Sequence, residues 1–126
     1  MKKKLLLILG FLVFTIVQIC KGEIEIKNPA IFTNTGWYGE AYRGKPMANG
    51  KAFDPDKLTA ASYDYRLGTK LLIVYRTKEV VCVVSDRGPS KELRDKGRRL
   101  DLSKAAFKKL ASTKVGVIRV QIFVLK

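Results

Sequence analysis

The sequence contains no histidine, two cysteines, and 11 acidic residues against 25 basic ones. Without histidine, the usual ligand sets for zinc and copper cannot be assembled within one chain, so we expect no metal centre and no cofactor. The cysteines are Cys20 and Cys82. If the N-terminal segment is removed, Cys82 alone is left, which excludes a disulfide within one mature chain. Because Cys82 lies within the apolar stretch VVCVV, we predict a small buried residue there rather than a reactive thiol.

Long apolar runs are also absent, except at the N-terminus. Three lysines at positions 2–4 precede an apolar run over residues 5–20, which is short for a membrane span. This order is typical of a secretory signal peptide, which we place at residues 1–22. We therefore expect an exported protein of the periplasm or cell envelope, with no membrane span in its mature form. The alternatives are an uncleaved anchor and a lipid anchor on Cys20, although Cys20 follows Ile19 where lipoprotein signals carry a small residue.

The shortage of acids leaves a formal net charge of +14. Such a balance favours polyanionic partners, which include nucleic acid, acidic envelope polymers and lipid headgroups. Export argues against nucleic acid as a partner. Charge alone thus leaves open a plain polyanion-binding protein of the envelope.

With 126 residues, the chain has room for one domain. We expect an exposed lead-in at residues 23–34 and a single domain at 35–126. Within that domain, we predict β-strands at 35–42, 58–63, 69–77, 79–86 and 115–126, and in the last of them apolar and polar residues alternate. A tight hairpin is predicted where YRTKEVV joins two of these strands, and one helix is predicted at 103–112. Many strands around one helix indicate a closed or nearly closed β-barrel, since closure removes exposed strand edges.

Five motifs follow one another at characteristic spacing. They are GWYGEAYRGKPMANGKAFDP at 36–55, LTAAS at 58–62, LGTKLLIV at 67–74, VVSDRGP at 83–89 and LDLSKAAFKKL at 100–110. In this order they resemble the rare lipoprotein A (RlpA) family over nearly the whole of residues 35–125. The resemblance implies a mainly β fold, a six-stranded double-psi β-barrel with one or two short helices.

The resemblance also implies an activity, endolytic cleavage of peptidoglycan glycan strands that lack stem peptides, with 1,6-anhydro-muramyl ends as products. Larger members of the family carry a C-terminal peptidoglycan-binding SPOR domain. This sequence ends at Lys126 without one, so we do not expect targeting to the division septum by that route.

Asp86 is the expected catalytic residue. A lytic transglycosylase needs no water, because the 6-hydroxyl of the sugar closes onto the anomeric carbon, and one carboxyl can transfer both protons. By resemblance, Asp86 matches the aspartate of the DRGP motif. The alternative is a turn acid that accepts backbone N–H groups before Gly88 and Pro89. Arg87 favours the carboxylate if its guanidinium faces Asp86.

Four residues are predicted to bind the substrate. Trp37 and Tyr38 offer faces on which a sugar can stack, although core packing explains them equally well. Arg87 and Ser62 are the polar members of the set. Ser62 stands where the family carries a histidine, and Lys51 stands where it carries a glutamate. These departures favour a second hypothesis, a non-catalytic carbohydrate-binding or wall-loosening module.

Other charged residues are assigned structural roles. Glu40 and Asp54 are interpreted as acids of a strand end or a turn. Asp101 matches a motif of the family but is interpreted as the N-cap of the predicted helix or an acid in its N-terminal turn. The basic segment 87–99 is predicted to be a solvated loop, with guidance of an anionic polymer toward Asp86 as the alternative.

Overall fold

The computed structural model of the protein describes residues 31–126. The predicted signal peptide at 1–22, the alternative anchor at Cys20 and lead-in residues 23–30 lie outside this range. None of the helices in residues 31–126 has the length and apolarity needed to span a bilayer.

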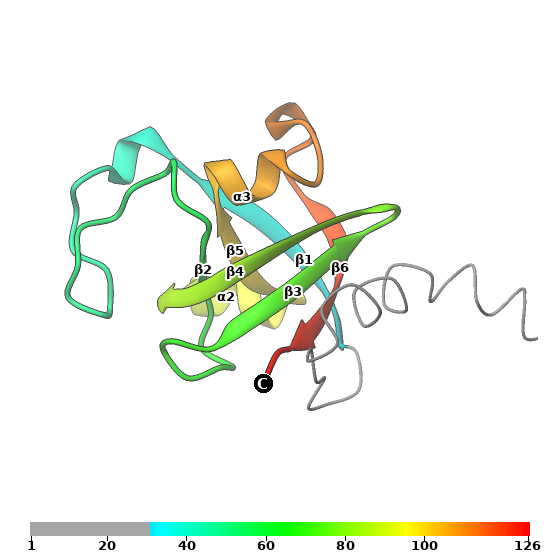
Figure 1. Cartoon of the computed structure of the whole chain (residues 1–126), viewed down its shortest axis with the longest axis horizontal. Helices are drawn as coiled ribbons and strands as arrows, with labels where there is room; N and C mark the ends of the chain where they lie inside the picture. Colours follow the sequence, from blue (N-terminus) through cyan, green and yellow to red (C-terminus); the bar gives the residue numbers. More distant parts are fainter. Residues whose placement is uncertain (1–30) are drawn as a thin grey trace, which may run out of the picture.

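Six strands close into a barrel in the order β1-β5-β2-β4-β3-β6 (Figure 1). The strands are β1 (Ile31–Tyr38), β2 (Thr59–Ala61), β3 (Lys70–Tyr75), β4 (Lys78–Asp86), β5 (Arg98–Ser103) and β6 (Ile118–Val124). The β1–β5 and β2–β4 pairs are parallel and the other four are antiparallel. Two short α-helices, α2 (Lys91–Asp95) and α3 (Lys104–Lys108), and two 3-10 helices, η1 (Glu40–Tyr42) and η2 (Thr113–Val115), complete the described part of the chain. The predicted mainly β, six-stranded barrel is confirmed.

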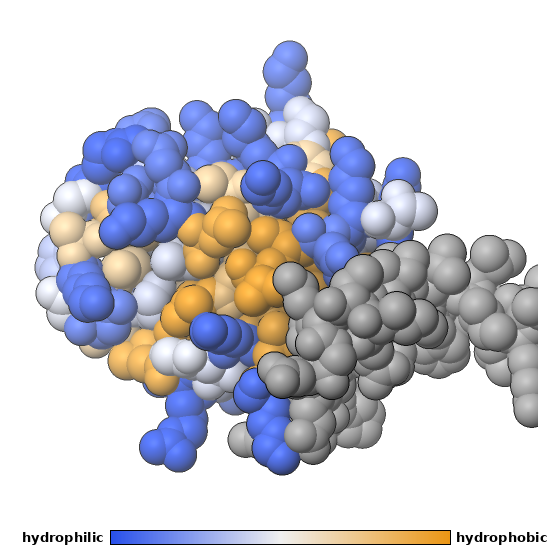
Figure 2. Space-filling view, viewed as in Figure 1, coloured by the Kyte–Doolittle hydropathy of each residue, from blue (hydrophilic) through white to orange (hydrophobic). Residues whose placement is uncertain are grey.

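Alternation of side chains builds the core of the barrel. In β6, Ile118, Val120, Ile122 and Val124 are buried, whereas the residues between them face outward. The strands β3 and β4 form the predicted hairpin, with Tyr75 paired to Lys78 and Arg76 at a positive φ of 54° in the turn. Apolar residues gather over the strands at the centre of the view in Figure 2, with hydrophilic residues around them.

Cys82 belongs to this core, as predicted. Its side chain is completely buried, and burial raises the pKa of its thiol to about 12. The thiol is therefore protonated at neutral pH and behaves as a small apolar group.

The N-terminal strand lies four residues earlier than predicted. β1 begins at Ile31, so residues 31–34 of the expected lead-in belong to the barrel. They pair with β6, in which Asn34 lies opposite Arg119. The other end of the predicted strand is also shifted, because β1 ends at Tyr38 and η1 follows.

The interpretation of the basic segment 87–99 as a loop is wrong. Helix α2 occupies its middle, and the side chain of Ser90 caps that helix by accepting a hydrogen bond from Leu93 N. Strand β5 begins at its end and was missed altogether. It buries Leu100 and Leu102 between β1 and β2, and two leucines among charged residues are too weak a pattern to predict a strand.

The helix after β5 is shorter than predicted. Its N-cap is Ser103, whose hydroxyl accepts a hydrogen bond from Ala106 N, and it ends at Lys108 rather than at residue 112. Asp101 therefore lies within β5 and not in the first turn of the helix, which corrects the role assigned to it from the sequence.

Candidate active site

Two adjoining cavities form a cleft beside the ends of β1, β4 and β5. The smaller one, about 210 Å³, is the carboxyl pocket, and its lining includes Tyr38, Ala61, Asp86 and Asp101. The larger one, about 550 Å³, is the aromatic groove, and its lining includes Trp37, Tyr38, Tyr42, Arg98 and Asp101. A volume of that size is typical of small-molecule sites. Tyr38, Tyr42 and Asp101 are among the residues that line both cavities, so the two lie side by side.

Strand register brings two aspartates together in the carboxyl pocket. Ala61 of β2 pairs with Asp86 of β4 on one side and with Asp101 of β5 on the other. All three residues line the pocket, and Ala61 has only a methyl group to place between the carboxyls. Residues that are 15 positions apart in sequence thus become neighbours across one small side chain.

Asp86 is held by three hydrogen bonds. Its Oδ1 accepts from the backbone N–H groups of Arg87, at 2.8 Å, and Ala48, at 3.0 Å. Its Oδ2 accepts from the hydroxyl of Tyr38 at 3.3 Å. An ionised carboxylate is a pure acceptor, so every one of these contacts suits the charged form. Asp86 therefore does accept backbone N–H groups at a turn, and it lines the pocket as well.

Asp101 lies in a different environment. Its side chain is 15% exposed. Its Oδ1 accepts a hydrogen bond from Nε of Arg98 at 2.9 Å and forms an ion pair with Nη2 at 2.8 Å. Burial raises the pKa of Asp101 above its ordinary value of 3.8, while the Arg98 guanidinium and a backbone hydrogen bond from Gly36 act in the opposite direction. Asp101 is thus the carboxyl of the pair that is better suited to carry a proton.

Tyr38 connects the two halves of the cleft. Its ring stacks on Phe53 at a centroid distance of 4.3 Å and meets the ring of Tyr42 edge to face at 5.7 Å. Burial raises the pKa of Tyr38 well above its ordinary value of 10.0, and the charge of Asp86 raises it further. The phenol is therefore protonated at neutral pH and donates its hydrogen bond to Asp86. Tyr42 is 50% exposed at the rim.

Trp37 has both a structural contact and a place in the groove. Its Nε1 donates to the carbonyl of Thr113 at 3.1 Å, and its ring packs partly against the core. The ring also lies against Gly39, where a Cβ atom would stand 2.9 Å from it. Trp37 thus packs against the core and also lines the aromatic groove, so both interpretations of this residue hold in part.

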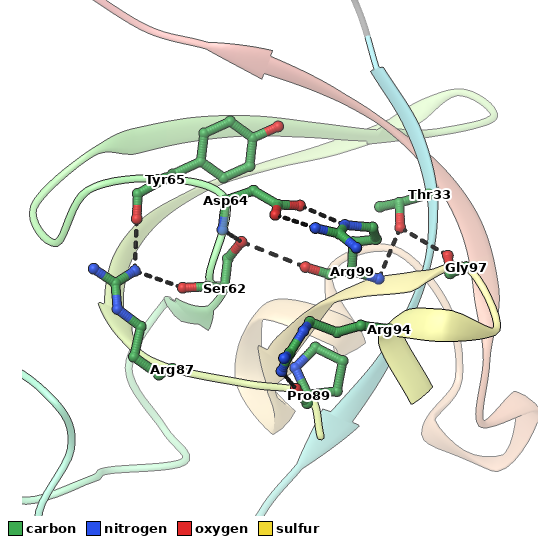
Figure 3. A network of polar contacts seen from close by, with 9 residues as sticks. All are labelled: Thr33, Ser62, Asp64, Tyr65, Arg87, Pro89, Arg94, Gly97 and Arg99. Atoms are coloured by element: carbon green, nitrogen blue, oxygen red, sulfur yellow. Dashed lines mark hydrogen bonds and ion pairs between the residues drawn. The ribbon is translucent and has the colours of Figure 1, made fainter. Parts of the chain in front are cut away.

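Ser62 and Arg87 face the loop after β2 (Figure 3). Nη1 of Arg87 donates to the carbonyls of Ser62 and Tyr65, both at 2.6 Å. Ser62 is fully buried, and its hydroxyl accepts from Asp64 N at 3.0 Å and donates to the carbonyl of Arg99 at 3.4 Å. The Arg87 guanidinium is thus occupied away from Asp86. The Ser62 side chain does not line either cavity of the cleft.

Lys51, Glu40 and Asp54 lie on the surface. Lys51 is exposed after a turn in which Gly50 N donates to Met47 O, and Ala48 of the same turn donates to Asp86. Glu40 and Asp54 both pair with Arg43, at 2.7 and 3.5 Å, and neither lines the carboxyl pocket. Within residues 31–126, no three acidic or cysteine side chains converge as metal ligands would.

Asp101 is the residue that sequence reasoning undervalued. The available signal was the alternation in LDLS, where Leu100 and Leu102 are buried in the core. Because successive side chains of a strand point to opposite faces, Asp101 had to point away from the core. What could not be read from the sequence is that Asp86 lies on the same side.

Comparison with known proteins identifies the relatives of this chain. A family model described as lytic transglycolase matches residues 30–122. The endolytic peptidoglycan transglycosylase RlpA of Rickettsia prowazekii is 37% identical over 111 residues, which cover 81% of this chain and 33% of the relative. The RlpA of Vibrio cholerae is 35% identical over 105 residues, which cover 79% of this chain and 38% of the relative. The chain thus spans between a third and two fifths of the length of these curated relatives.

Solved structures share the fold. The Streptomyces papain inhibitor matches with a TM-score of 0.65 and 21% identity, over 82% of this chain and 100% of the inhibitor. A mutant expansin of Clavibacter michiganensis in complex with cellohexaose matches with a TM-score of 0.60 and 22% identity, over 78% of this chain and 51% of the expansin. At such identities the likeness shows the fold, and together with the family match it supports the double-psi form of the six-stranded barrel.

Proposed function

The chain belongs to the lytic transglycolase family, and on that premise we propose that it acts in the cell envelope as an endolytic peptidoglycan transglycosylase. Its substrate is the glycan strand without stem peptides, and its products carry 1,6-anhydro-muramyl ends. The RlpA relatives, whose name states this activity, support the reaction. The observation that carries the proposal is the pair of carboxyls on either side of Ala61.

The two carboxyls divide the proton transfers between them. Asp101, which burial keeps closer to its neutral form, protonates the glycosidic oxygen as the C1–O bond breaks. Asp86, whose carboxyl accepts hydrogen bonds from three donors, faces the positive charge that develops at C1. It then takes the proton of the 6-hydroxyl as O6 bonds to C1. Two carboxyls in contrasting environments are a known solution for acid and base chemistry in one site.

This division differs from the single-residue scheme predicted from the sequence, in which Asp86 transfers both protons. It also gives a reason why the site can dispense with the family histidine. The proton is carried by Asp101, and the position of that histidine is filled by Ser62, which serves the adjacent loop.

The aromatic groove supplies the binding surface for the strand. Tyr42 and Trp37 present ring surface beside Asp101, and aromatic rings bury the apolar faces of sugars. A glycan laid in the groove thus reaches the carboxyl pocket through the residues that the two cavities share.

A non-catalytic carbohydrate-binding module is the second candidate function. It is favoured by the two departures from the family pattern, Lys51 and Ser62. In that case the cleft binds the strand, and the carboxyls only accept hydrogen bonds from it.

The test uses the purified full chain and its Asp86→Asn and Asp101→Asn variants with denuded glycan strands, and counts 1,6-anhydro-muramyl ends by mass spectrometry. We expect the parent to form these ends and each variant to be slower by about 10²–10⁴-fold, the usual contribution of a positioned acid or base. Asp54→Asn is the matched control, because Asp54 is an exposed acid outside the pocket. A parent that binds the strands without forming anhydro ends would establish the binding module instead.

A further inference from the structure

Arg98 enters the cleft by crossing β1 at Gly36. The two residues lie on neighbouring parallel strands, and the guanidinium occupies the space where a side chain at position 36 would begin. A Cβ atom built on Gly36 would collide with Nη2 and Cζ of Arg98. Glycine thus allows the arginine to lie against the backbone of β1 and to line the aromatic groove beside Trp37 and Tyr38.

Part of the Arg98 guanidinium has no partner in the described part of the chain. Nε and Nη2 both bind the same oxygen of Asp101. Nη1 makes no hydrogen bond or ion pair within residues 31–126, although the side chain is only 22% exposed. A guanidinium offers five N–H groups in one plane, and the free ones suit a planar acceptor such as a carboxylate.

The charges around the groove leave Arg98 as its available cation. Glu40 is the other charged residue of the groove lining apart from Asp101, and the guanidinium of Arg43 binds both of its carboxylate oxygens. When Asp101 carries the proton that it donates to the leaving oxygen, the positive charge of Arg98 loses its partner. A partly buried charge without a partner is unfavourable, so the protonated site favours a ligand that brings a negative charge.

The ligand must combine ring surface for the aromatic residues with a carboxylate for Arg98. Of the two sugars of a glycan strand, N-acetylglucosamine has no acid group, whereas N-acetylmuramic acid carries a lactyl ether. The lactyl carboxylate is free when no peptide is attached to it, and it becomes an uncharged amide when one is.

We propose that Arg98 forms a subsite for the free lactyl carboxylate of a muramic acid residue, through which the cleft selects strands without stem peptides. The proposal rests on the proposed function of the cleft as a glycan site. It assigns to one side chain the preference for denuded strands that the resemblance only implied.

The experiment measures binding, so that it does not depend on turnover. Trp37 is the one tryptophan of the sequence and lines the groove, so its fluorescence reports occupancy. The full chain carrying Asp86→Asn, to slow cleavage, is titrated with denuded glycan oligosaccharides and with the same oligosaccharides after reduction of their carboxyls to alcohols. The titrations are repeated with Arg98→Gln and Arg98→Lys, and with Arg94→Gln as a control, since Arg94 lies outside the groove lining and binds the carbonyl of Pro89.

We expect the carboxylate form to bind about tenfold more tightly than the reduced form, as one charge-assisted hydrogen-bonded pair provides. Arg98→Gln should bind both forms equally, Arg98→Lys should keep part of the preference, and Arg94→Gln should keep all of it. Circular dichroism checks that each variant is folded.

Two results would overturn the subsite. If the protein with Arg98 intact binds the carboxylate and reduced forms equally, Arg98 does not recognise the lactyl carboxylate. If both forms are nevertheless cleaved, the transglycosylase proposal still stands. An equal loss of affinity for both forms in Arg98→Gln would mean that Arg98 only positions Asp101. If neither form binds and no anhydro ends appear with the parent, the subsite and the proposed function both fail.

Discussion

The two sides of the carboxyl pocket are built differently, although both acids pair with the same residue, Ala61. On the β4 side, Asp86 ends a strand and is fixed by donors from a turn, from its own neighbour and from Tyr38. On the β5 side, Asp101 lies within a strand and depends on burial and on Arg98. The same side chain is thus prepared as an acceptor in one place and as a proton carrier in the other, which shows that environment, not residue type, assigns the role.

The largest expected effect on stability falls on the Asp101 side alone. Gly36→Ala introduces a Cβ atom where the Arg98 guanidinium lies, so we expect a loss of about 1–3 kcal/mol in the free energy of unfolding, typical of overpacking. Chemical denaturation measures it. In an Arg98→Ala background the collision partner is gone, and the same substitution should cost much less. An equal cost in both backgrounds would mean that Arg98 does not explain the glycine.

A comparable but smaller effect falls on the Asp86 side. Tyr38→Phe keeps the stack on Phe53 and removes only the hydroxyl that donates to Asp86. We expect turnover of glycan strands to fall about tenfold, the value of one hydrogen bond to a charged group, with affinity for the strands unchanged. The control is Tyr63→Phe, since Tyr63 is exposed and away from the cleft lining. Unchanged turnover in Tyr38→Phe would show that the hydroxyl does not prepare Asp86.

Ser62→Ala should disturb neither carboxyl. It removes a buried hydroxyl that bonds to the backbone of Asp64 and Arg99, so we expect a loss of about 1 kcal/mol in unfolding free energy. Thermal and chemical unfolding measure that loss, and strand cleavage at fixed temperature should stay within about twofold of the parent. A large rise in KM would instead restore Ser62 as a substrate-binding residue.

The smallest expected effect is a shift in the pH dependence of kcat/KM. The alkaline limb of kcat/KM reports the deprotonation of the acid in the free enzyme, and in this account that acid is Asp101. Arg98 lowers the pKa of Asp101 against the raising effect of burial. Arg98→Gln removes the lowering cause, so the pKa rises and the limb moves to higher pH. Carboxyl-reduced strands are the substrate to use, because they do not engage the proposed subsite. A limb that moves to lower pH would contradict the assignment.

The barrel could be predicted from the sequence where its strands carry their own signal. β3 and β4 carry continuous apolar runs, LLIV and VVCVV, β6 alternates buried and outward residues, and the hairpin between β3 and β4 has a two-residue turn. Strand β5 could not be predicted, because two leucines among charged residues form a strand only through pairing with β1 and β2, which are distant in sequence. The start of β1 was not predicted for the same reason, since residues 31–34 form a strand by pairing with β6, at the other end of the sequence.

The candidate site was predicted in part, because motif resemblance marks residues but not their orientation. Asp86 and Tyr38 do lie together. Arg87 lines the carboxyl pocket as well, but its Nη1 donates to the loop after β2. Ser62 bonds to backbone groups outside the cleft lining, and Asp101 comes into the pocket only through the register of β2 with both of its neighbours. Register of this kind is a property of the closed barrel and not of any local stretch of sequence.

The dependence of the cleavage rate on the leaving group is the most direct test of whether Asp101 is the acid and Asp86 the base. A nitrophenyl glycoside of a disaccharide that ends in N-acetylmuramic acid expels a phenolate that needs no proton, whereas the natural strand expels an alkoxide that does. The account predicts that Asp101→Asn is slowed by about 10²–10⁴-fold on strands yet turns over the nitrophenyl glycoside nearly as fast as the parent, while Asp86→Asn is slow on both. If Asp86→Asn is instead the variant that the good leaving group rescues, Asp86 is the acid and the assignment of the two carboxyls is wrong.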